Sequence, residues 1–186
     1  MIQRRAFLKS SLLLASSSLS LPGFANQLAN NASAATASGD CCLRFYNTHT
    51  GEKLKSTFWA EGEFIPDALK DINKVLRDHR SNKIADIDPQ LLLLLGQLND
   101  KLDNSKELHI ISGYRAPESN AFLRSHGSGG VAKRSLHMDG KAIDIRLPGT
   151  DLRTLQKAAM SLKGGGVGYY ASSQFVHMDT GRVRYW

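Results

Sequence analysis

The 186-residue sequence has only two cysteines and no long apolar run. Each of these absences excludes a class of protein. Its two cysteines cannot build a disulfide scaffold or a four-cysteine zinc site. No apolar run reaches the roughly 20 residues that a membrane span requires. Hydrophobic residues make up 41% and charged residues 22%, which excludes collagen-like, coiled-coil and wholly disordered chains. The length fits one globular domain with a terminal tail.

The first 25 residues have the three parts of an export signal. Arg4 and Arg5 give a cationic start, an apolar stretch diluted by serine follows, and small residues lead up to Ala25. The arginine pair with the Ala-Phe-Leu-Lys that follows it resembles a twin-arginine signal. A buried N-terminal helix is the alternative, but nothing after Ala25 continues its pattern. We therefore expect a twin-arginine-type signal peptide at residues 1–25 and a protein exported to the periplasm.

The charge of the exported protein is lower than that of the whole chain. The net charge is +7, and removal of the signal takes away three cations and no acid, which leaves +4. No later block combines lysine or arginine with interleaved aromatic residues. We expect no nucleic-acid partner and no stable membrane insertion after signal cleavage. Residues 26–40 are small and polar and are predicted to be a flexible tether to a folded domain at 41–186.

Hydrophobic periodicity in the remaining sequence predicts an α+β fold, because helical patterns and short strand patterns mix without regular βαβ spacing. Strand patterns lie at 43–59, as a hairpin, and at 108–112, 142–147 and 174–179. Helical patterns lie at 66–80, from 88 onward, at 117–125 and at 152–162. The second helix carries five consecutive leucines and is predicted to be the central core helix.

One segment brings a histidine and a carboxylate to the start of a strand. His137 precedes Gly140, which permits a sharp turn because glycine has no Cβ. On the strand that follows, Asp144 points to one face while Ile143 and Ile145 point to the other. The turn can fold His137 back over Asp144, so that an imidazole nitrogen and a carboxylate oxygen reach one point.

The last predicted strand adds a second histidine. Phe175, His177 and Asp179 share one face, and two residues of strand separate His177 from Asp179 by about 6.6 Å. Two histidines and one aspartate leave the fourth position of a zinc ion open for water, as in catalytic zinc sites. On residue types alone, the alternative is that each histidine is an ordinary core or surface residue.

Several motifs in order resemble the D-alanyl-D-alanine carboxypeptidase/hedgehog group of zinc peptidases, and in particular its murein endopeptidases. The first has the form Ser-x-His-x-x-Gly-x-Ala-x-Asp and spans 135–144. The others are Ile-Ser-Gly-Tyr-Arg at 111–115, Gly-Val-Ala-Lys at 130–133, the glycine-rich 164–170 and Phe-Val-His-Met-Asp-Thr-Gly at 175–181. The resemblance covers roughly residues 43–186.

This resemblance implies a hedgehog/D-Ala-D-Ala-peptidase-like domain with a small antiparallel sheet and flanking helices. It implies one Zn²⁺ per chain, held by His137, Asp144 and His177. The implied activity is hydrolysis of peptide cross-links of peptidoglycan, including bonds between two diaminopimelate residues, in cell-wall growth. The alternatives are a non-catalytic peptidoglycan-binding protein and a murein carboxypeptidase.

Three further residues are candidates for the site. Many relatives place a Glu or Asp as general base three residues before the last zinc histidine, where this chain has Gln174. Asp179 is the nearest substitute, as a base or as a support that orients His177. Arg115 is predicted to stabilise an oxyanion, with a surface arginine as the alternative. Ser135 either binds substrate or caps its loop.

The remaining histidines are interpreted as structural or surface residues, because they lack metal-ligand spacing: His49, His79, His109 and His126. The glycine run at 164–168 lacks the Gly-Lys-Ser/Thr ending of a phosphate-binding loop. Its predicted roles are to end a helix and to allow close backbone packing near the site.

Overall fold

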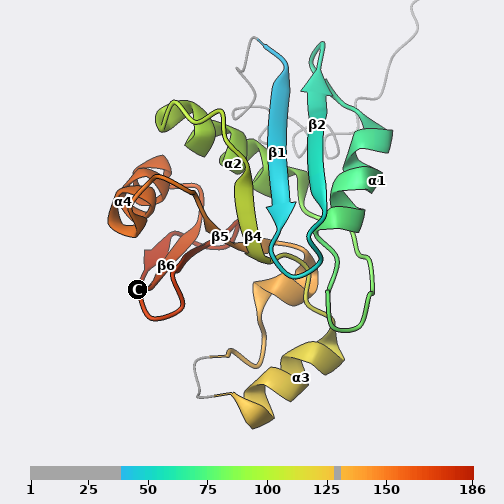
Figure 1. Ribbon diagram of the computed structural model, residues 1–186, viewed down its shortest axis with the longest axis vertical. Helices are drawn as coiled ribbons and strands as arrows, with labels where there is room; N and C mark the ends of the chain where they lie inside the picture. Colours follow the sequence, from blue (N-terminus) through green and yellow to red (C-terminus); the bar gives the residue numbers. More distant parts are fainter. Residues whose placement is uncertain (1–38, 128–130) are drawn as a thin grey trace, which may run out of the picture. The chain divides into compact units, whose positions relative to one another are not determined.

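An eight-stranded sheet forms the centre of the molecule, with strand order β3-β2-β1-β4-β5-β7-β6-β8 (Figure 1). The computed structural model describes residues 39–127 and 131–186, which belong to one unit of the chain. The signal peptide predicted at 1–25 lies outside the described residues, as does the tether except for its last two residues. No helix in the described ranges is long and apolar enough to cross a bilayer.

The elements do not alternate regularly: three strands precede two helices, and three strands follow the last helix, as in an α+β fold. The strands are β1 (Cys41–Asn47), β2 (Lys53–Ala60), β3 (Glu63–Phe64), β4 (Leu108–Ser112), β5 (Ala142–Arg146), β6 (Gly166–Tyr170), β7 (Phe175–Asp179) and β8 (Arg184–Tyr185). The helices are α1 (Pro66–Val75), α2 (Pro89–Lys101), α3 (Pro117–His126) and α4 (Leu152–Leu162), with a 3₁₀ turn at Leu136–Asp139.

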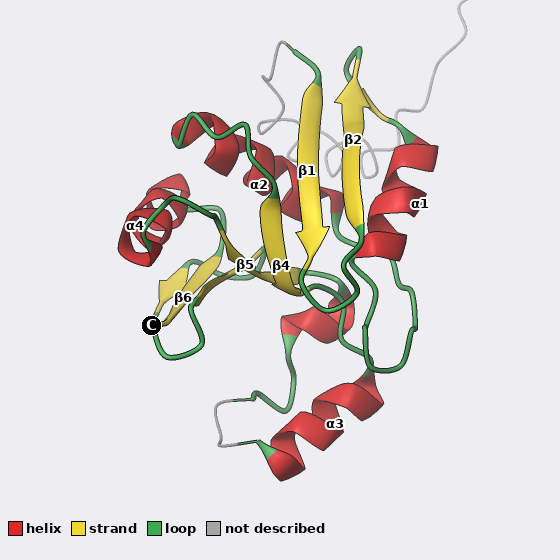
Figure 2. Cartoon of the chain, in the orientation of Figure 1, coloured by secondary structure: helices red, strands yellow, loops and turns green. Residues whose placement is uncertain are grey.

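Most neighbouring strands of the sheet are antiparallel, which confirms the predicted fold class. The two exceptions are the pairs β1–β4 and β6–β8, which run parallel. A parallel pair needs a crossover connection, and α1 and α2 supply it between β1 and β4. Figure 2 shows α3 apart from the other three helices, past the end of β4.

The two faces of the sheet differ because side chains alternate along each strand. Ile143, Ile145, Val176 and Met178 are all buried in the hydrophobic core. Residues 91–95 of α2 belong to the same core, which confirms the prediction of a central helix. The opposite faces of β5 and β7 therefore remain for polar side chains.

The first helix ends five residues earlier than its pattern predicts, at Val75 and not at residue 80. The buried carboxylate of Asp78 accepts hydrogen bonds from the backbone N–H groups of Arg80, Ser81 and Ala116. Because these bonds hold the chain in a turn, they replace the next turn of helix. The bond from Ala116 is long-range, so no local pattern indicates it.

Gly140 makes the turn that the sequence predicts between His137 and β5. Its φ is +65°, a left-handed conformation that side chains disfavour. Its carbonyl oxygen accepts the N–H of Asp88 at 3.0 Å, and a Cβ at this position would collide with the carbonyl oxygen of Asp86. The turn is therefore closed by backbone from the loop before α2.

We expect Gly140→Ala to destabilise the fold by about 1–3 kcal/mol, because the substitution adds backbone strain and a steric clash. Gly96→Ala is the matched control, since Gly96 lies inside α2 with open space around it. Alanine there should leave stability unchanged or raise it by up to about 1 kcal/mol. Urea denaturation of both variants measures the difference, and equal stabilities would contradict the role given to Gly140.

Candidate functional site

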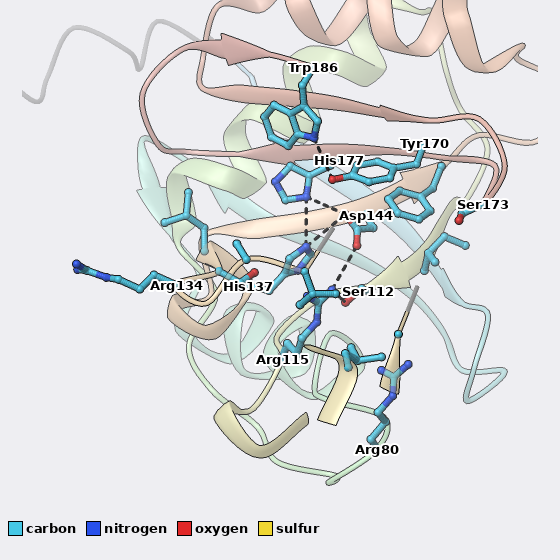
Figure 3. Close-up of a pocket in the computed structure, with 18 of the residues that line it drawn as sticks. Arg80, Ser112, Arg115, Arg134, His137, Asp144, Tyr170, Ser173, His177 and Trp186 are labelled. Carbon is cyan, nitrogen blue, oxygen red and sulfur yellow. Dashed lines mark hydrogen bonds and ion pairs between the residues drawn. The ribbon is translucent and has the colours of Figure 1, made fainter. Parts of the chain in front are cut away.

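Three buried side chains from separate parts of the chain meet at one point: His137, Asp144 and His177 (Figure 3). The Oδ1 atom of Asp144 lies 2.8 Å from Nδ1 of His177 and 3.3 Å from Nε2 of His137. The two imidazole nitrogens are 3.3 Å apart. The sequence predicts this juxtaposition, and the structure contains it.

Local structure positions each of the three residues. Asp144 and His177 are direct partners in the antiparallel register of β5 and β7. His137 lies in the 3₁₀ turn that ends at Gly140. Its backbone carbonyl accepts the N–H of Arg115 at 3.1 Å, which ties the turn to the chain after β4.

The hydrogen bonds around the two imidazoles determine which nitrogen each presents. Nδ1 of His137 lies 2.7 Å from the carbonyl oxygen of Gly113, so this nitrogen carries a proton and donates it. Nε2 of His177 donates to Oδ2 of Asp179 at 3.0 Å. His137 therefore presents Nε2, and His177 presents Nδ1, to Asp144.

This arrangement has the dimensions of a metal site. Ligand atoms bound at 2.0–2.1 Å to one tetrahedral zinc ion lie about 3.3 Å apart. The three separations here are 2.8, 3.3 and 3.3 Å. Lone-pair atoms as close as Asp144 Oδ1 and His177 Nδ1 need a proton or a cation between them. Two nitrogens and one carboxylate oxygen are ligands that zinc accepts.

The residues of the cluster shift the pKa values of Asp144 and His177 in the directions that favour their charged forms. Burial alone would raise the pKa of Asp144, but the charges and hydrogen bonds of His137 and His177 outweigh burial and hold it well below its usual value. Burial alone would lower the pKa of His177, but hydrogen bonds to Asp144 and Asp179 outweigh burial and raise it. The site therefore keeps Asp144 ionised and favours a positive charge beside it.

Asp179 lies behind His177 and is fully buried. It accepts two hydrogen bonds from the guanidinium of Arg184 and one each from the N–H groups of Gly166 and Gly181. These bonds and that of His177 outweigh burial and lower its pKa. Because Asp179 does not line the cavity, its position favours the supporting role over that of general base.

Arg115 is half-buried at the cavity wall, where it is paired with the carboxylate of Asp144 and not with one on the outer surface. Its side chain is 12% exposed, and its Nη2 atom lies 3.6 Å from Oδ2 of Asp144 and 3.3 Å from Oγ of Ser112. Its Nε atom is buried and has no hydrogen-bond partner among the described residues. The Nη2 end of the guanidinium is therefore the part that reaches the cluster.

Ser135 and Gln174 differ in their relation to the site. Ser135 lines the cavity, and its side chain makes no capping bond to the 3₁₀ turn, which favours the substrate-binding alternative. Gln174 lies in the turn before β7 with φ +55°, and its amide donates to the carbonyl of Ala171 at 2.6 Å. It does not line the cavity in the described part of the chain.

The cluster lies in a cavity of about 770 Å³, which is large enough for a peptide segment. Asp144 is the only carboxylate residue among the described lining residues. Sequence reasoning missed several polar and aromatic members of this lining: His49, Arg80, Ser112, Arg134, Tyr170, Arg184 and Trp186. Ser112 lies in the motif at 111–115 and Tyr170 in the motif at 164–170, but no sequence pattern indicates that their side chains face the cavity.

Comparisons with known proteins find one family. The family model Peptidase_M15_2, described as peptidoglycan L,D-endopeptidase MepK, matches residues 35–186. Peptidoglycan L,D-endopeptidase MepK of Escherichia coli K12 is 44% identical over 144 residues, which cover 77% of this chain and 79% of that protein. A Haemophilus influenzae relative named "Probable peptidoglycan L,D-endopeptidase MepK" is 42% identical over 145 residues, 77% of each chain. No solved structure matches the chain significantly.

We expect Asp179→Asn to lower the pKa of His177 in the metal-free protein, because it removes one of the two acceptors that raise it. A raised folded-state pKa stabilises the fold below pH 6.5, and this stabilisation is lost as the pH rises through the folded-state value. The variant should therefore lose stability mainly at low pH. NMR titration of the imidazole measures the shift, with Asp71→Asn on the exposed face of α1 as control. An unchanged His177 titration would contradict the contact.

Proposed function

The chain belongs to the Peptidase_M15_2 family, that of peptidoglycan L,D-endopeptidase MepK, and we propose on this premise that it hydrolyses peptide cross-links of peptidoglycan. The observation that carries the proposal is the buried His137–Asp144–His177 triangle at the wall of a peptide-sized cavity. The family match extends over the whole described part of the chain.

We propose that His137, Asp144 and His177 hold one Zn²⁺ per chain. Their separations fit tetrahedral zinc, and the tautomers set by Gly113 and Asp179 direct a lone pair from each imidazole to the centre. When bound, zinc makes a water molecule acidic enough to act as a nucleophile near neutral pH and polarises a carbonyl.

The protein's own residues supply orientation and charge. Asp179 fixes the ring of His177 through Nε2, and Arg184 holds Asp179 in place. Arg115 lines the cavity with its Nη2 atom 3.6 Å from Asp144, and its positive charge there stabilises negative charge on the carbonyl oxygen under attack. Ser135 contacts the substrate from the cavity wall.

The substrate proposed here is the cross-linking peptide of peptidoglycan, including the diaminopimelate–diaminopimelate bond. Such a substrate places the enzyme in the periplasm, as the predicted twin-arginine-type signal at 1–25 does. We propose that cleavage of the cross-links opens the mesh for cell-wall growth. Nucleic acid and membrane lipid have no part in this proposal.

One observation favours a second candidate, a peptidoglycan-binding protein without hydrolytic activity. The position where many relatives carry a catalytic carboxylate is Gln174, which is exposed and is not among the described residues that line the cavity. A protein that keeps the pocket and lacks a base would bind cross-links without cutting them. Product analysis distinguishes the two functions.

We expect His137→Ala and His177→Ala each to weaken zinc binding by more than about 100-fold, because loss of even an outer partner of a ligand costs 10- to 100-fold. Both variants should lose hydrolysis. His109→Ala, a histidine on β4 outside the cluster, is the control and should bind zinc normally. Chelator competition measures affinity, and normal affinity in both cluster variants would refute the ligand assignment.

We expect residues 26–186 to convert purified cross-linked muropeptide dimers into monomers. A chelator should stop the reaction and added zinc should restore it. Mass spectrometry identifies the products. Loss of a single terminal amino acid would show a carboxypeptidase, and absence of any product with retained binding would show the non-catalytic alternative.

A further inference from the structure

Strand β6 places a tyrosine on the same face of the sheet as the His–Asp–His cluster. β6 and β7 pair antiparallel, with Gly168 opposite His177 and Tyr170 opposite Phe175. Since side chains alternate, Gly168 and Tyr170 share the face that carries His177. Both Tyr170 and Phe175 line the cavity, and their rings stack with centroids 4.6 Å apart.

Trp186 fills the space that Gly168 leaves open. A Cβ on Gly168 would lie within 2.7 Å of three atoms of the indole ring, so only glycine allows this packing. The indole centroid lies 5.3 Å from that of His177. The guanidinium of Arg184, which also binds Asp179, lies 4.8 Å from the indole centroid. Trp186, which is 47% exposed, therefore packs with its inner side against residues of the cluster and its support.

The indole of Trp186 in turn fixes the hydroxyl of Tyr170. Nε1 of Trp186 donates to Oη of Tyr170 at 2.9 Å. Because indole is a donor only, the phenol oxygen is the acceptor and its own proton is directed elsewhere. No described residue accepts that proton. Figure 3 shows Tyr170 and Trp186 beside His177, with Arg115 on the other side of Asp144.

The described cavity is thus lined both by the Tyr170 hydroxyl, whose proton no described residue accepts, and by the guanidinium of Arg115. A hydroxyl that accepts one hydrogen bond becomes a stronger donor for the next. A preorganised donor at such a position is most effective against charge that develops during the reaction. Tyr170 lines the cavity on the same face of the sheet as His177, and its hydroxyl is held by the indole of Trp186.

We propose that Tyr170 is a catalytic residue of the peptidase and that Trp186 is its positioning residue, an inference that rests on the proposed function. When water that has released one proton to the solvent adds to the scissile carbonyl as hydroxide, a C–O bond forms and the C=O π pair moves onto the carbonyl oxygen. The Tyr170 hydroxyl donates a hydrogen bond to that oxygen and keeps its proton. Arg115 stabilises the same charge from the opposite side.

Tyr170→Phe tests the hydroxyl alone, because the ring and its stacking on Phe175 remain. We expect kcat to fall about 100-fold, the usual cost of one oxyanion donor, with KM within about threefold of wild type. Zinc affinity should not change. Tyr169→Phe is the matched control, since Tyr169 lies on the other face and packs under Arg153 with its centroid 3.7 Å from the guanidinium carbon. Unchanged kcat in Tyr170→Phe, or loss of its zinc, would overturn the proposal.

Trp186→Phe keeps an aromatic ring but removes the N–H donor. We expect kcat to fall about tenfold in the wild-type background and to change little in the Tyr170→Phe background, because the effect passes through the hydroxyl. Equal losses in both backgrounds would overturn the positioning role of Trp186.

A binding measurement separates this proposal from the proposed function. A phosphinate peptide, in which a tetrahedral phosphorus replaces the scissile carbonyl, resembles the charged state of the reaction. We expect Tyr170→Phe to weaken binding of the phosphinate about 100-fold and of the uncleaved cross-link peptide less than threefold. Equal binding of the phosphinate by both proteins would overturn the role of Tyr170. If the wild type binds both molecules but cleaves no cross-link, the proposed hydrolytic function is wrong. The difference in phosphinate affinity between the wild type and Tyr170→Phe still decides the role of Tyr170.

Discussion

The site depends on the burial of one ionised carboxylate between two imidazoles. Asp144 is 5% exposed, and an isolated charge at that depth would be expensive to bury. His137, His177 and Arg115 repay that cost because each directs a nitrogen at the carboxylate within 3.6 Å. The β5–β7 register provides the closest of these contacts. A slip of one residue would turn Asp144 into the hydrophobic core, so the register of the sheet and the chemistry of the site are fixed together.

Much of this site follows from the sequence because its geometry is local. The two-residue period of β5 and β7 predicts which side chains share a face, and Gly140 predicts the turn that returns His137 to Asp144. The early end of α1 does not follow, because Asp78 stabilises it through the distant N–H of Ala116. Strands β6 and β8 do not follow from the sequence either. Four glycines in β6 and just before it weaken its strand pattern, and β8 has two residues and pairs with β6 across the intervening β7.

The glycine run at 164–168 is predicted to end a helix and to allow close packing near the site. The predicted close packing near the site is confirmed in detail: a Cβ on Gly165 would collide with the Asp179 backbone, one on Gly166 with the Asp179 and Arg184 side chains, and one on Gly168 with Trp186. The absence of three side chains therefore lets Asp179 reach the back of His177 and lets Trp186 lie beside it. The helix before the run has already ended at Leu162, so close packing is the larger of its roles.

The arginines of the cavity divide into two groups by their partners. Arg184 is paired with Asp179, and Arg115 lies 3.6 Å from Asp144, so these two serve the centre. Arg80 and Arg134 also line the cavity, are exposed, and form no ion pair with any described residue. The rim of the cavity, formed here by Arg80 and Arg134, is consequently positive. At the centre, the charges of Arg115 and Arg184 are compensated by those of Asp144 and Asp179. Free cations at a rim attract an anionic substrate through the electric field that they add to the cavity. A cross-link peptide that carries free carboxylates fits this distribution of charge better than a neutral one.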